Sequence, residues 1–79
     1  MPEVGLGLAL ERFTMVVQGE VSCVVDIVAN ETASIVLTAL PDFPLDIDPD
    51  TARQFVAAWR HRAELESQSY EVRQEQREV

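Results

Sequence analysis

The fold is decided by residues 11–40, ERFTMVVQGEVSCVVDIVANETASIVLTAL. This stretch is rich in β-branched and aromatic residues, and it is interrupted at Gln18-Gly19-Glu20 and at Asn30-Glu31-Thr32. Apolar runs separated by short polar turns are typical of successive β-hairpins. The pattern, which begins near Leu8, therefore predicts an antiparallel meander of three strands.

The register of these strands follows from which side chains must be buried. Three-residue turns set Arg12 opposite Asp26, whereas a two-residue first turn would set Glu11 opposite Asp26, and directly opposed like charges are destabilising. A shift by one residue would also exchange the two faces of a strand. We therefore expect three-residue turns, with Val16, Val24 and Val36 on a second, mostly polar face. The apolar face then contains Phe13, Met15, Val17, Val21, Cys23, Val25, Ile27, Ile35, Leu37 and Ala39.

A helix is predicted at about residues 49–69. Asp48 can cap it, Pro49 suits the first helical position, and Asp50 lies where a helix favours negative charge. A polar tail follows at about 70–79, which we expect to continue as a solvated helix or to fray. The apolar stripe of the helix should pack on the sheet and consists of Ala52, Phe55, Val56, Trp59 and Ala63.

The connection to the helix, residues 41–50 (PDFPLDIDPD), reads as an extended edge segment. Phe43, Leu45 and Ile47 alternate with aspartates, so we expect their side chains to point inward and the carboxylates outward. Proline is tolerated at such an edge. The fold class is thus α+β: an antiparallel three- to four-stranded meander at about 8–47 packed on one C-terminal helix, in a single domain spanning 1–79.

Composition excludes several classes of protein. A chain of 79 residues with 47% apolar and 25% charged residues fits one small globular domain. A single cysteine cannot form an internal disulfide, and neither a membrane span nor a basic signal region is visible, so we expect a cytoplasmic protein. Six arginines, no lysine and a net charge of -8 argue against direct binding of nucleic acid.

The sequence fits no catalytic or metal-binding motif. Residues 46–50 resemble the opening of a calcium-binding EF-hand loop, but Thr51 and Ala57 stand where that loop needs glycine and glutamate. Cys23 should be a buried, inert thiol, and His61 should face solvent, so neither a zinc site nor a Cys-His nucleophile is expected. We expect no enzyme activity, no metal and no cofactor.

The charge distribution supplies the candidate site. Residues 1–52 hold nine acids and one base, so they carry the whole net charge of -8. A rigid array of carboxylates could occupy a groove lined with Lys and Arg that was built for nucleic acid. The same charge could serve only to keep the protein soluble. The candidate partner-binding residues are Asp42, Asp46, Asp48 and Asp50 in the connection, with Glu20, Asp26 and Glu31 adding to their field.

In size, acidity and the stretch Asp42–Asp50, the chain resembles small phage-encoded anti-CRISPR and DNA-mimic inhibitors. The resemblance implies docking on the DNA-binding surface of a CRISPR effector subunit in the bacterial host cytoplasm, with carboxylates standing in for phosphates. Two other functions stay open. One is a structural or assembly subunit that homodimerises through Val16, Val24 and Val36, and the other is an antitoxin-like protein whose helix caps a toxin.

Overall fold

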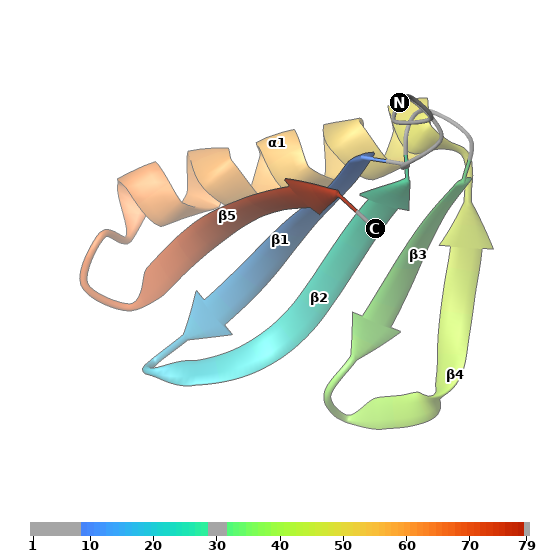
Figure 1. The fold of residues 1–79 in the computed structure, drawn as a ribbon. Coiled ribbons are helices and arrows are strands. Elements are labelled where there is room, and N and C mark those ends of the chain that lie inside the picture. Colours follow the sequence, from blue (N-terminus) through green and yellow to red (C-terminus); the bar gives the residue numbers. More distant parts are fainter. Residues whose placement is uncertain (1–8, 29–31, 79) are drawn as a thin grey trace.

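The computed structural model describes residues 9–28 and 32–78, which form five strands and one helix. In chain order these are β1 (Ala9–Val17), β2 (Glu20–Val28), β3 (Thr32–Leu37), β4 (Leu40–Ile47), α1 (Pro49–Leu65) and β5 (Tyr70–Glu78). The strands make one antiparallel sheet in the order β4-β3-β2-β1-β5 (Figure 1). The α+β class and the meander, including its fourth strand, are confirmed.

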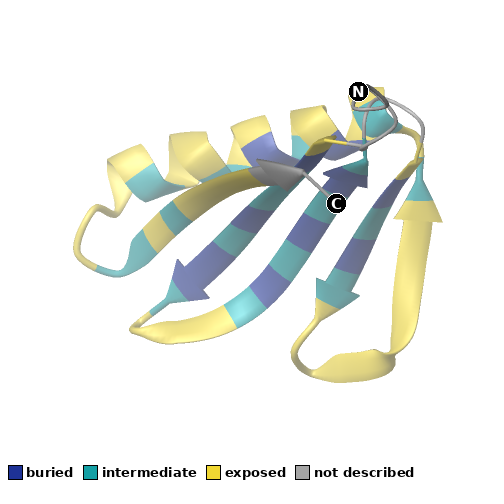
Figure 2. Ribbon diagram, in the orientation of Figure 1, coloured by how far each residue is buried: buried dark blue, intermediate teal, exposed yellow. Residues whose placement is uncertain are grey.

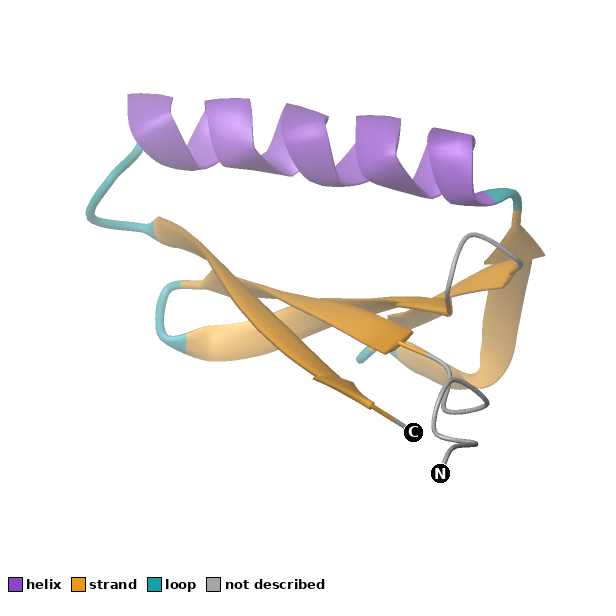
Figure 3. Ribbon diagram, turned by 45° about the horizontal axis from the view of Figure 1, so that its top comes forward, coloured by secondary structure: helices purple, strands orange, loops and turns teal. Residues whose placement is uncertain are grey.

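Helix α1 covers one face of the sheet (Figure 3). The Asp48 side chain caps it by accepting a hydrogen bond from the backbone N–H of Thr51 at 3.0 Å, and Pro49 occupies the first turn, as the sequence predicts. Ala52 and Val56 are buried, and Phe55 and Trp59 pack against the core at partial exposure. The helix ends at Leu65, four residues before the expected boundary.

The tail expected at 70–79 is instead strand β5, which returns beside β1. Val72 lies opposite Met15 and packs against the core, while the backbone N–H of Gln18 bonds the carbonyl of Ser69 at 2.6 Å. The strand was missed because it lies at the edge of the sheet and is mostly exposed, so its sequence lacks the apolar alternation of a half-buried strand.

The hydrophobic core lies between α1 and the three central strands, and its buried residues alternate along β2 and β3 (Figure 2). The expected register is confirmed between β1 and β2, with Arg12 opposite Asp26. Between β2 and β3 the pairing differs, because Thr32, expected in the second turn, lies in β3 opposite Val28; the same side chains still share a face. Six of the residues assigned to the apolar face are buried there: Phe13, Met15, Cys23, Val25, Ile27 and Ile35.

The turn between β1 and β2 differs from the expected three residues. Gln18 and Gly19 form a two-residue turn with φ of 53° and 82°, the left-handed values that tight hairpins need. A β-bulge follows, because Met15 faces Cys23 while Val16 faces Val21, which leaves Ser22 as the extra residue. The bulge restores the register that a three-residue turn would give.

Candidate functional site

Strand β4 is the most exposed strand of the sheet. Every residue from Leu40 to Asp46 is exposed, and Figure 2 shows this strand uncovered along most of its length. The expected inward orientation of Phe43 and Leu45 is wrong, since these side chains are 74% and 57% exposed. The reason is the path of α1, which starts right after β4 and packs on β2, β3 and β5. Of the alternating apolar residues, Ile47 alone packs against the core.

The exposed apolar residues of β4 adjoin the end of β3. Leu40 faces Leu37 across the hairpin, and Leu45 faces Ile35. Leu37 and Leu40 are 40% and 52% exposed, so the expected burial of Leu37 is also wrong. Ala39, likewise expected on the apolar face, is exposed in the turn. Contiguous exposed apolar residues rimmed by polar ones often mark an interaction site. We name this set the β4 surface: Leu37, Leu40, Asp42, Phe43, Leu45 and Asp46.

Two prolines decide how this edge can be used. Pro41 and Pro44 lie within β4 and have no backbone N–H to donate. Prolines on an edge strand oppose the addition of a further strand. A partner would therefore contact the side chains of the β4 surface rather than extend the sheet along β4.

The seven candidate carboxylates do not form one group. Asp42 and Asp46 lie on β4 and are exposed beside the apolar residues. Glu20 begins β2, with β3 between it and β4. Asp50 lies in the first turn of α1, and Glu31 falls outside the described residues. Asp42 and Asp46 thus share strand β4 with the exposed apolar residues, although Asp46, opposite Ser34, lies on the other face of the sheet from Leu45, opposite Ile35; the remaining carboxylates lie on other elements.

Asp26 is engaged by the protein's own arginine. Arg12 donates from Nε to Oδ1 at 2.7 Å and from Nη2 to Oδ2 at 2.9 Å, a bidentate pair on the sheet face opposite α1. The hydrogen bond and the charge of Asp26 raise the pKa of Arg12 above its usual value, with a smaller contribution from Glu75. A carboxylate held in this way is less available to a basic partner.

Asp48 is likewise committed to a structural contact. Its Oδ1 accepts from the Thr51 hydroxyl at 2.7 Å and its Oδ2 from the Thr51 backbone. These hydrogen bonds lower the pKa of Asp48 below the usual value for aspartate. Its role as the cap of α1 accounts for its position without reference to a partner.

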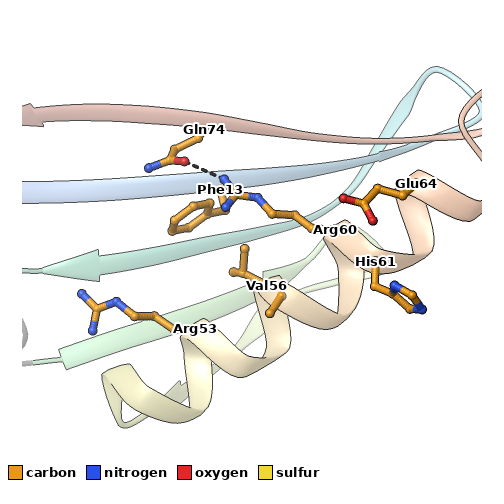
Figure 4. Close-up of a pocket in the computed structure, with 8 residues that line it drawn as sticks. Phe13, Arg53, Val56, Arg60, His61, Glu64 and Gln74 are labelled. Atoms are coloured by element: carbon orange, nitrogen blue, oxygen red, sulfur yellow. Dashed lines mark hydrogen bonds between the residues drawn. The ribbon is translucent and has the colours of Figure 1, made fainter.

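A groove of about 430 Å³ lies beside α1, shown in Figure 4. Arg60 reaches from the helix across this groove, where its guanidinium lies 5.3 Å from the centre of the Phe13 ring and donates to the side-chain oxygen of Gln74. His61 points away from Gln74 and is exposed, as expected. The groove is thus spanned by an arginine that links α1 to β1 and β5.

The described residues contain no cluster of three or more histidine, cysteine, aspartate or glutamate side chains suited to hold a metal ion. Cys23 is buried as expected, and burial raises the pKa of its thiol. In the described part of the chain, no helix has the length and apolar character required to cross a membrane.

Comparisons with protein-family models, with curated proteins and with solved structures give no match for this chain. The case for a candidate site on β4 therefore comes from the geometry of this chain and not from relatives. Sequence reasoning selected Asp42 and Asp46 and missed the exposed Phe43 and Leu45. The signal that could have found them is the pair of prolines on either side of Asp42 and Phe43, since prolines are typical of an uncovered edge.

Proposed function

We propose that this chain is an acidic binding protein that blocks a basic, nucleic-acid-binding site on a bacterial protein through its β4 surface. The observation that carries the proposal is the exposure of Phe43 and Leu45 on the same strand as Asp42 and Asp46. No basic residue occurs between Arg12 and Arg53, so the stretch of sequence that contains β4 carries a strongly negative net charge.

The mechanism combines two kinds of contact. Asp42 and Asp46 are four residues apart, which is about 13 Å in an extended strand, so they can take the place of separate phosphates in a groove lined with Lys and Arg. Phe43 and Leu45 supply apolar anchors, which usually contribute more to affinity than charges at the rim of an interface. The overall charge of -8 would speed the encounter with a basic partner.

The resemblance to anti-CRISPR and DNA-mimic inhibitors makes a CRISPR effector subunit one partner of this kind. The two other functions considered, homodimerisation through the sheet face and an antitoxin-like contact through the helix, have less exposed apolar surface to support them. Val16 is only 4% exposed, and Val24 and Val36 are half-buried, so the sheet face opposite α1 offers a weaker apolar contact than β4. On α1, Leu65 is exposed as an isolated apolar residue near the helix end.

The test is a capture experiment from bacterial lysate at about 50 and 500 mM salt, in which duplex DNA and single-stranded RNA compete for any protein retained. We expect the retained protein to be released by high salt and by nucleic acid. The variants D42N/D46N and F43S/L45S should each lose it, whereas E64Q/E66Q, which removes the same charge from the end of α1 and its C-cap, should retain it. Undiminished capture by D42N/D46N, or capture that nucleic acid does not compete, would overturn the proposal.

A further inference from the structure

Strand β5 forms the other edge of the sheet, and among the described residues it pairs on one side only, with β1. It is nine residues long and contains no proline, so every residue can donate a backbone hydrogen bond. An edge of this kind presents unpaired N–H and C=O groups to a further strand. In this respect β5 differs from β4, whose two prolines remove backbone donors from that edge.

The side chains of β5 alternate in charge on the face opposite α1. Glu71 lies opposite Val16, Arg73 opposite Thr14 and Glu75 opposite Arg12, all on that face of the sheet. Tyr70, Val72 and Gln74 lie on the side of α1, where Tyr70 packs on Trp59 and Gln74 bonds Arg60. Residues 71–77 contain two glutamates and two arginines, so this part of a strongly acidic chain is neutral.

We propose that two copies of this chain pair antiparallel through β5, about a twofold axis at Gln74. Gln74 is the midpoint of Tyr70–Glu78, so an axis there gives the longest overlap of the two strands. Directly opposed residues of an antiparallel pair share a face. In this register Arg73 of each copy lies opposite Glu75 of the other, and Glu71 lies opposite position 77, which is an arginine in the sequence.

The two registers whose axes lie one residue to either side of Gln74 are electrostatically unfavourable. An axis at Arg73 would oppose two arginines at the axis and set Glu71 against Glu75 on both sides. An axis at Glu75 would oppose two glutamates. Opposite charges directly across a strand pair each contribute roughly 0.2–1 kcal/mol, whereas like charges are destabilising. Axes at Val72 or Gln76 would also oppose unlike charges, but with fewer strand residues overlapping. The register at Gln74 therefore combines unlike pairs with the longest overlap.

The single chain already holds one of these groups in a local contact. Arg73 donates from Nε to Glu71 at 2.8 Å, and both side chains are more than half exposed. This pair lowers the pKa of Glu71 and raises that of Arg73. In the dimer Arg73 would lie between Glu71 of its own strand and Glu75 of the second copy, so the exposed local pair need not be given up.

The dimer would be one continuous sheet of ten strands, with both helices on the same face. The two β4 strands would then form its two free edges, and each β4 surface would stay accessible. This assembly differs from the homodimer expected from the sequence, which would use the valines of the sheet face rather than the edge of β5.

Sedimentation velocity over about 10 µM to 1 mM protein tests the proposal, because this range detects dimers with dissociation constants in or near it. We expect the mass of the wild-type chain to double as the concentration rises. R73E opposes two glutamates and E75R opposes two arginines, so each should weaken the dimer about 10-fold or more. The double variant R73E/E75R restores unlike pairs and should recover the dimer.

A mixture of R73E and E75R provides a second test, because glutamate of one chain then faces arginine of the other at both positions. We expect this mixture to form a heterodimer while each variant alone is monomeric, with circular dichroism showing that both are folded. A wild-type chain that stays monomeric at about 1 mM would overturn the proposal. So would variants that dimerise like wild type, or a folded double variant and mixture that both fail to associate.

Discussion

Strand β4 carries two prolines, exposes Phe43 and Leu45, and bears two aspartates with no base. Strand β5, at the opposite edge of the same sheet, has no proline and alternates glutamate with arginine. Both edges are exposed to water, but they limit pairing with a further strand in different ways. Proline removes backbone donors for any approaching strand, whereas alternating charge disfavours some registers of strand pairing and favours others. The two edges are therefore suited to different partners: β4 to the side chains of another protein, and β5 to a second copy of the chain.

The largest expected difference concerns folding. Ending the chain after Ser69 would remove β5, expose one side of β1 and take Tyr70 and Val72 from the packing around α1. Because a domain of this size has little stability to spare, we expect the shortened chain to lose cooperative thermal unfolding, measured by circular dichroism. The control F43S/L45S should melt within about 3 °C of wild type. A shortened chain that melts at the wild-type temperature would show that β5 is dispensable.

Matched aspartate substitutions sharpen the same comparison. V72D places a charge where β5 packs against the core, and we expect it to lower the free energy of unfolding by about 2–3 kcal/mol. L45D places the same charge on the exposed β4 and should change stability by less than about 0.5 kcal/mol. Urea unfolding of the two variants measures both values. Equal losses would mean that β4 is as well packed as β5.

A smaller difference in the free energy of unfolding distinguishes Asp26 from the aspartates of β4. D26N breaks the bidentate pair with Arg12, and because this pair is about one-third exposed we expect a loss of about 1 kcal/mol. D46N, on β4, should leave the free energy of unfolding unchanged in the same urea experiment. In the capture experiment the order should reverse, with D26N retaining the partner better than D42N/D46N. The division between structural and binding carboxylates would be wrong if D26N were as stable as wild type.

The smallest effect is a pH dependence at the junction of β4 and α1. The Thr51 hydrogen bonds lower the pKa of Asp48 in the folded state. The stabilisation from this carboxylate is therefore complete above the ordinary aspartate pKa of about 4, and it is lost as the pH falls through the lowered value. D48N keeps a capping oxygen but does not titrate, so the melting temperatures of D48N and wild type should converge as the pH falls from about 6 to 2. A constant difference between them would contradict this assignment.

The central part of the fold was predictable because burial leaves a pattern in the sequence. The alternation around Phe13 and Cys23 and the helical stripe around Val56 each specify one buried face, and the structure has both. The first turn was predicted with the wrong length, yet the register held, because a bulge at Ser22 satisfies the same apolar face. The pairing of Arg12 with Asp26 followed from the same apolar face, together with the avoidance of like charges in direct opposition.

The edges were less predictable because their environment depends on tertiary structure. Phe43 and Leu45 have the alternation of a half-buried strand, and only the path of α1 decides that they stay exposed. For β5 the opposite is true: its polar sequence does not predict a strand, and only its pairing with β1 makes it one. Within the candidate site, the sequence grouped Asp48 with Asp42 and Asp46, although an aspartate directly before Pro49 was also the predicted helix cap.

The most direct test of the two-edge account is hydrogen exchange measured by mass spectrometry at low and high protein concentration. We predict that amides in residues 70–78 become more protected as the concentration rises, because β5 acquires a second strand, while amides in residues 40–46 exchange at the same rate throughout. Protection that appears in β4 instead, or in neither edge at any concentration, would contradict the account.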